Sequence, residues 1–207
     1  MNRRKWGGAC ALIAIISAGS FVHADDVEPA NFRGDPNSVM AKIDLTMGPP
    51  TIVVTEGANP TYPLSTIPPT VSGPVTGPTP GGQLYQIELP NYIDDLPLKL
   101  MRIQYSWFGA SGDARTETIN VSPNIPGGSI QLVDSIPPMP VPSEPNAFYR
   151  WDDFEIRPNP DFEAIQVEFI NADPRWLVID TISTVPEPAS LTIASLAGMI
   201  LLAWRRR

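Results

Sequence analysis

The chain has 207 residues, a formal net charge of −8, one cysteine and one histidine. Cys10 and His23 both lie within the first 24 residues, so residues 25–185 contain neither a thiol nor an imidazole. This composition excludes disulfide bonds, zinc sites of the Cys/His type and histidine-dependent nucleophilic catalysis from that long segment.

The charge of this segment is strongly acidic. From Asp25 to Val185 the chain has 21 acidic and 8 basic residues, which gives a formal charge of −13. Nucleic acids and anionic lipids bind proteins through clustered Lys and Arg, which release counterions on contact. We therefore expect neither to be a partner of this part of the chain.

The first 24 residues have the pattern of a secretory signal peptide. Residues 1–6 are basic, residues 9–22 are apolar, and Val22 and Ala24 place small residues where a signal peptidase cuts. We expect cleavage between Ala24 and Asp25, so that signal peptidase is a partner and residues 25–184 form one exported domain.

Alternation of apolar and polar residues is the main structural signal in that domain. It predicts half-buried strands at 41–47, 85–89, 101–107 and 165–169. Enrichment in β-branched and aromatic residues between turn residues predicts five more strands, at 51–55, 116–121, 129–133, 148–156 and 176–182.

The fold class follows from this strand pattern. No helical period is sustained between residues 25 and 184, and 25 prolines in the chain would interrupt one. We predict an all-β, two-sheet β-sandwich that is jelly-roll-like, flanked by the signal peptide and a C-terminal transmembrane helix. Alternate residues should form its core, as in the predicted strand with Met101, Ile103, Tyr105 and Trp107 on one side.

Two proline-rich segments interrupt the strand pattern. Residues 48–82 contain nine prolines and are interpreted as an insertion, in which 68–82 forms an extended or turn-rich surface loop. Residues 136–145 contain five prolines and are predicted to run as polyproline II across the edge of the sandwich.

The candidate ligand-binding residues combine aromatic rings with carboxylates. Tyr149, Trp151, Asp152 and Asp153 follow one another closely, and such groups suit a sugar, because a ring packs on the C–H face of a pyranose while a carboxylate accepts hydroxyl protons.

The alternative interpretation makes these aromatic residues part of the core. In a regular strand Tyr149 and Trp151 face away from Phe148, Arg150 and Phe154, so that one of the two sets should be exposed. The sequence leaves open which set that is.

Three acidic clusters are candidate calcium ligands: Asp94 and Asp95; Asp152, Asp153 and Glu155; Asp161 and Glu163. Calcium takes six to eight oxygen ligands, yet none of the three clusters has the spacing of a recognised calcium loop. We predict no cofactor and no catalytic residues, with calcium as the alternative.

The last 23 residues combine three elements. Pro186, Glu187 and Pro188 form a rigid tripeptide, residues 189–204 are uncharged, and Arg205, Arg206 and Arg207 end the chain. As a helix the uncharged stretch would be about 24 Å long, against roughly 30 Å for the hydrocarbon core, so it spans a membrane only if the bilayer thins or side chains snorkel. The arginines predict a cytoplasmic C-terminus.

This tail resembles the PEP-CTERM sorting signal of exported proteins of Gram-negative bacteria. The resemblance covers residues 185–207 and implies that Pro186, Glu187 and Pro188 are recognised by a membrane enzyme of the exosortase type. It also implies that this enzyme cuts near the tripeptide and either releases the domain or transfers it to the cell surface or extracellular matrix.

The function predicted from these features is that of an exported, non-enzymatic surface or matrix protein whose domain binds exopolysaccharide. Two alternatives belong to other classes. One is a carboxylate-dependent glycan-processing enzyme, which the lack of histidine does not exclude. The other is a periplasmic scaffold module retained in the membrane by an intact tail.

Overall fold

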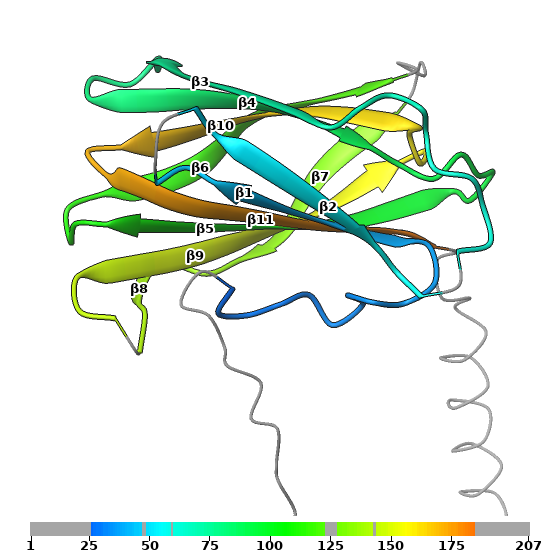
Figure 1. Ribbon diagram of the computed structural model, residues 1–207, viewed down its shortest axis with the longest axis horizontal. Coiled ribbons are helices and arrows are strands. Elements are labelled where there is room, and N and C mark those ends of the chain that lie inside the picture. The colour runs from blue at the N-terminus through cyan, green and yellow to red at the C-terminus, as the bar shows by residue number, and fades with distance from the viewer. Residues whose placement is uncertain (1–25, 47–48, 59, 123–127, 143, 185–207) are drawn as a thin grey trace, which may run out of the picture.

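Two antiparallel β-sheets face each other in the computed structural model, which describes residues 26–46, 49–58, 60–122, 128–142 and 144–184 (Figure 1). The signal peptide, the sorting tripeptide, the predicted helix 189–204 and the terminal arginines lie outside these residues. The described part of the chain contains strands and no helix, so the prediction of an all-β, two-sheet fold is confirmed.

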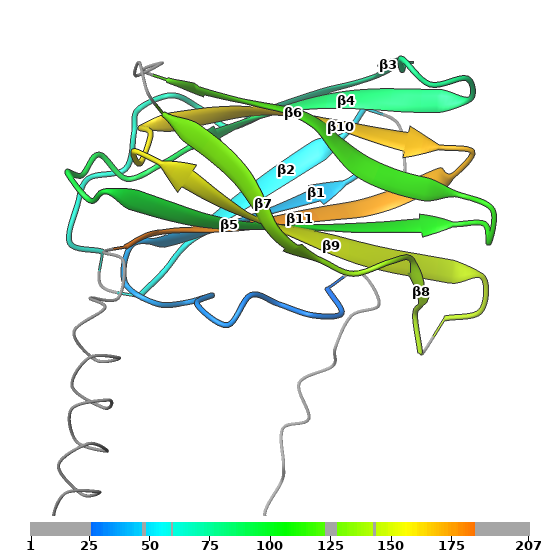
Figure 2. The ribbon, with the colours of Figure 1, turned by 180° about the vertical axis from the view of Figure 1, so that it is seen from behind.

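The first sheet, called here the wide sheet, has the strand order β2-β1-β11-β5-β9-β7, and β8 also pairs with β9. Figure 2 shows β7 and β9 from the side opposite to that of Figure 1. Its strands are β1 (Ser38–Asp44), β2 (Thr51–Glu56), β5 (Leu98–Phe108), β7 (Ser129–Ser135), β8 (Met139–Pro140), β9 (Ala147–Arg157) and β11 (Asp173–Thr184).

The second sheet, called here the narrow sheet, has the strand order β3-β4-β10-β6. From β4 to β7 successive strands alternate between the two sheets, so that each sheet contains strands from both the first and the second half of the chain. The wide sheet has seven strands and the narrow sheet four, whereas a regular jelly roll has eight strands in total. The strands of the narrow sheet are β3 (Thr70–Thr76), β4 (Gly82–Pro90), β6 (Asp113–Ser122) and β10 (Phe162–Ile170).

All nine strands predicted from the sequence are present, and two were missed. The interpretation of residues 68–82 as a loop is wrong, because β3 pairs with β4 there. A bulge between Ser72 and Val75 interrupts the pairing around Gly73, whose φ is +123°. Pro74 lacks an N–H, and such a residue is tolerated because β3 is an edge strand. Within 136–145, β8 pairs with β9 in place of an unpaired polyproline stretch.

The core lies between the two sheets and contains the alternate residues that the sequence pattern predicted. Met101, Ile103, Tyr105 and Trp107 of β5 are each at most 1% exposed. The narrow sheet contributes Phe169, whose ring meets that of Tyr105 edge-on with centroids 6.4 Å apart. Edge-to-face packing of this kind adds to the free energy gained from burying apolar surface.

A buried ion pair connects the two sheets. The ammonium of Lys99 in β5 contacts a carboxylate oxygen of Glu163 in β10, and both side chains are fully buried. Burial lowers the pKa of Lys99 and raises the pKa of Glu163, against the attraction between the two charges. The loss of hydration therefore offsets much of what the pair contributes to stability.

We predict that breaking this pair costs far more stability than removing it. Lys99→Met or Glu163→Leu alone should lower the free energy of unfolding by about 3–5 kcal/mol, because each leaves a buried charge without a partner. The double variant should recover most of this loss. Urea unfolding of the four proteins measures it, and a double variant that loses the sum of the two single losses would contradict the prediction.

Candidate functional site

The structure separates the four ligand-binding residues predicted from the sequence. Tyr149 and Trp151 lie on the outer face of the wide sheet, 4% and 7% exposed. Asp152 points inward, where it accepts a hydrogen bond from the hydroxyl of Tyr105 at 3.0 Å. Asp153 points outward and binds the guanidinium of Arg102 through two hydrogen bonds of 2.7 and 2.8 Å. The two neighbouring carboxylates therefore lie on opposite faces of one sheet.

The predicted alternation along β9 is correct, but the expectation that one set of side chains is exposed is wrong. Phe154 packs into the core between the sheets, and Tyr149 and Trp151 form a second apolar cluster on the other face. Neither set is exposed. Ile136 and Val141, which flank β8, pack in the second cluster, and the segment Asp26–Arg33, called here the N-terminal arm, runs along the outer face of the wide sheet (Figure 1).

Glu28 makes the central contacts of the N-terminal arm. Its carboxylate accepts hydrogen bonds from the hydroxyl of Tyr149 at 3.3 Å and from the indole N–H of Trp151. Its backbone N–H donates to the side-chain oxygen of Gln104 at 2.8 Å, and its carbonyl accepts from Arg102 at 3.3 Å. One residue of the arm therefore occupies four polar groups of the sheet.

Arg33 fixes the other end of the arm. Its guanidinium donates to both carboxylate oxygens of Asp180 in β11, each at 2.6 Å, and to the carboxylate of Asp26. Burial raises the pKa of Asp180, although Arg33 opposes this by favouring the charged carboxylate. Asp180 is 1% exposed, so its charge depends on the arm for compensation.

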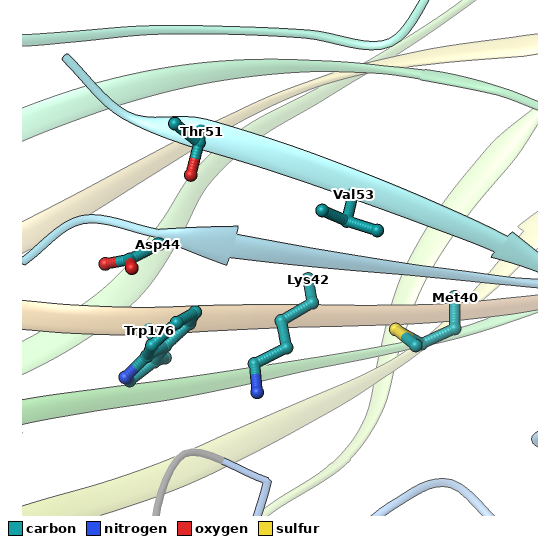
Figure 3. Close-up of a pocket in the computed structure, with 6 residues that line it drawn as sticks. All are labelled: Met40, Lys42, Asp44, Thr51, Val53 and Trp176. Atoms are coloured by element: carbon teal, nitrogen blue, oxygen red, sulfur yellow. The ribbon is translucent and has the colours of Figure 1, made fainter.

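The open part of the same face contains a pocket, called here the outer groove. Strands β1, β2 and β11 place its side chains on one side of the sheet (Figure 3). They point outward because their neighbours Ala41, Ile43 and Leu177 point into the core. The outer groove is lined by Met40, Lys42, Asp44, Thr51, Val53 and Trp176.

Trp176 is the aromatic residue of the outer groove, and it is half-buried. The ammonium of Lys42 lies 4.4 Å from the centre of its ring, a cation–π contact. Such contacts contribute about 0.5–1 kcal/mol at exposed sites. The groove offers an aromatic face beside an ammonium, the Asp44 carboxylate and the Thr51 hydroxyl, all groups that bind sugars.

The sequence pattern predicts a strand at 176–182 but does not mark Trp176 as a binding residue. The alternation along 176–182 is the signal that could have identified Trp176 as a surface residue. It places Trp176 and Asp180 on one face of the strand and Leu177 and Ile179 on the other. What the sequence could not give is the register, which places Trp176 opposite Asp44 of β1.

The acidic clusters do not assemble a metal site within the described residues, where no group of three or more Asp, Glu, His or Cys side chains is placed to hold an ion. Asp152 binds Arg150 at 2.6 Å, Asp153 binds Arg102, and Glu163 binds Lys99. The amide of Asn159 donates to Asp94 at 2.8 Å. These carboxylates form ion pairs and hydrogen bonds of the sandwich.

Comparison with known proteins identifies the C-terminal segment. The family model of the PEP-CTERM protein-sorting motif matches residues 184–207. The described all-β sandwich is therefore followed by a PEP-CTERM sorting motif, which marks the chain for export and for sorting at the membrane by an exosortase-type enzyme. No curated protein and no solved structure matches the chain. Among the described residues there is no helix that could cross a membrane.

We predict that sorting depends on the motif and not on the sandwich. Glu187→Ala combined with deletion of Arg205–Arg207 should leave the chain uncut and associated with the membrane, because the charge of the tripeptide and the terminal arginine cluster of the matched motif are both lost. Mass spectrometry of C-terminal peptides from cell fractions measures it. Trp176→Ala is the control and should be processed like the wild type; normal processing of the tail variant would contradict the prediction.

Proposed function

We propose that the sandwich is a non-enzymatic, polysaccharide-binding component of the cell surface or extracellular matrix, and that the outer groove is its binding site. The observation that carries this proposal is the half-buried ring of Trp176 beside Lys42, Asp44 and Thr51 on an open sheet face. The PEP-CTERM motif supports the proposal, because it implies export and sorting at the membrane, and such polysaccharides occur outside the cell.

The electrostatics favour a neutral or weakly charged polysaccharide. The segment Asp25–Val185 has a formal charge of −13, which repels polyanions at long range. In the groove itself Lys42 and Asp44 carry opposite charges and stand on one strand. Hydroxyl groups can satisfy both, because they donate to the carboxylate and accept from the ammonium.

The proposal of a non-enzymatic role is supported by how the carboxylates are used. Glycoside hydrolysis needs two carboxyl groups about 5 to 10 Å apart that converge on one bond. Asp152 and Asp153 are neighbours in sequence but face opposite sides of the sheet, and each is held by an arginine. Their arrangement serves the packing of β9.

The binding proposal predicts the effect of removing one ring. Trp176→Ala should weaken binding to a polysaccharide identified on a glycan array by about tenfold, or about 1.4 kcal/mol, because the stacking face is lost. Titration of the full-length chain in detergent measures it.

Tyr62→Ala is the matched control for this experiment. Tyr62 is also a half-buried aromatic residue, but it lies in the loop between β2 and β3, outside the outer groove. Its replacement should leave the affinity unchanged. Equal affinities of the wild type and Trp176→Ala would rule out the outer groove as the binding site.

A further inference from the structure

The N-terminal arm covers side chains that continue the outer groove across the wide sheet. Strand register aligns Trp176 with Ser106 of β5, and Ser106 with Tyr149 of β9. The next outward row runs from Lys42 through Val178 and Gln104 to Trp151. The open groove and the covered residues are therefore two halves of one face, which spans roughly 19 Å from β2 to β9 at normal strand spacing.

We propose that the N-terminal arm is a displaceable cover, and that the residues beneath it are a second, extended subsite for the same saccharide chain. This inference rests on the proposed function of the outer groove. It assigns Tyr149, Trp151, Arg102 and Gln104 to ligand binding once the arm has moved, and leaves short saccharides to the outer groove alone.

The groups beneath the arm are hydrogen-bonding groups of the kind that sugar hydroxyls satisfy. Tyr149, Trp151 and Arg102 each donate to Glu28, and the side-chain oxygen of Gln104 accepts from it. Glu28 thus supplies acceptors and a donor at the positions that a bound polyhydroxylated chain would fill. Arg102 stays in place without the arm, because Asp153 holds it through two hydrogen bonds and it stacks on Trp151 at 4.0 Å.

The arm is held mainly by polar contacts from two residues. Glu28 and Pro29 are exposed although they lie on the sheet, and the arm has no regular secondary structure. Few buried apolar contacts and an exposed backbone are features of segments that open locally. Opening also separates Arg33 from Asp180, so that this carboxylate must then be compensated by water or by a ligand. Val27 and Ala30 contribute the apolar contacts. Val27 packs against the second cluster, and Ala30 is buried at the start of the turn that its carbonyl forms with Arg33.

A turn after the arm gives it a fixed end and a point to pivot. Gly34 has a φ of +85°, which favours glycine, and no atom outside its neighbours lies within 4 Å of the position of a Cβ. Beyond it, Ser38 accepts a hydrogen bond from the backbone N–H of Gly57, and Gly34 accepts one from Ala58. The turn thus remains attached to the end of β2 when the arm lifts.

Local charges define which saccharides the extended subsite takes. With the arm lifted, the carboxylates of Asp153 and Asp180 face the single guanidinium of Arg102 on this part of the sheet. The net negative charge disfavours uronic acids and sulfated sugars. Neutral oligosaccharides long enough to reach from Trp176 to Trp151 are the expected ligands.

The test uses the full-length chain, the double variant Glu28→Ala/Arg33→Ala, and four neutral probes: cellobiose, cellohexaose, maltose and maltohexaose. Loss of the contacts of Glu28 and Arg33 with the sheet should tighten hexasaccharide binding at least fivefold and leave disaccharide binding unchanged. The matched control is Arg115→Ala/Glu117→Ala, which removes one acid and one base from the narrow sheet, and it should change neither. Isothermal titration measures the affinities.

A second measurement does not depend on how well the variants fold. Adding the tighter-binding hexasaccharide to the wild type should increase hydrogen exchange of backbone amides in residues 26–33, because the ligand displaces the arm. Equal hexasaccharide affinities for the wild type and the double variant, or unchanged exchange in the arm, would overturn the proposal that the arm is a displaceable cover. If Trp176→Ala still weakens binding, the outer groove remains supported as a binding site. Failure of every probe to bind either protein would overturn both proposals.

Discussion

Burial of alternate side chains between the two sheets is the interaction on which the rest of this structure depends. The segment from Asp25 to Val185 has no cysteine, so no disulfide can support the sandwich. In β5, Ile103, Tyr105 and Trp107 are completely buried. Because successive residues of a strand point to opposite faces, burying these residues also fixes which side chains point outward. The surface of the wide sheet is therefore a consequence of its core.

The unequal widths of the sheets influence where ligands can bind. The inner face of the wide sheet packs on the narrow sheet, while the N-terminal arm covers part of the outer face and Ile136 and Val141 pack on that face at β9. The arm covers residues of β5, β9 and β11 and leaves the groove at β1 and β2 open. If an extended polymer binds this face, as proposed, the position of the arm determines how much of the face it can reach.

The sequence was sufficient for most of the fold and insufficient for the site, for physical reasons. Alternation identified strands such as 101–107 because each has one face in the core. It failed at β3, where Gly73 and Pro74 look like turn residues, since the sequence could not show that this strand lies at an edge.

The site could not be predicted because it depends on segments that are far apart in the chain. Glu28 and Trp151 are 123 residues apart, and no local pattern links them. Alternation did place Tyr149 and Trp151 on one face, but the irregular arm that covers them has no periodicity to detect. The opposite orientations of Asp152 and Asp153 were implied by the strand itself, whereas the alignment of Trp176 with Asp44 needed the register.

The most direct test of the account follows the indole N–H signals of the tryptophans by NMR while neutral hexasaccharides are added to the full-length protein. We expect a saturable shift for Trp176, a shift for Trp151 as its hydrogen bond to Glu28 is replaced, and an unchanged signal for Trp107 in the core. Saturable binding that leaves the signal of Trp176 unchanged would contradict the claim that the outer face of the wide sheet is the binding surface.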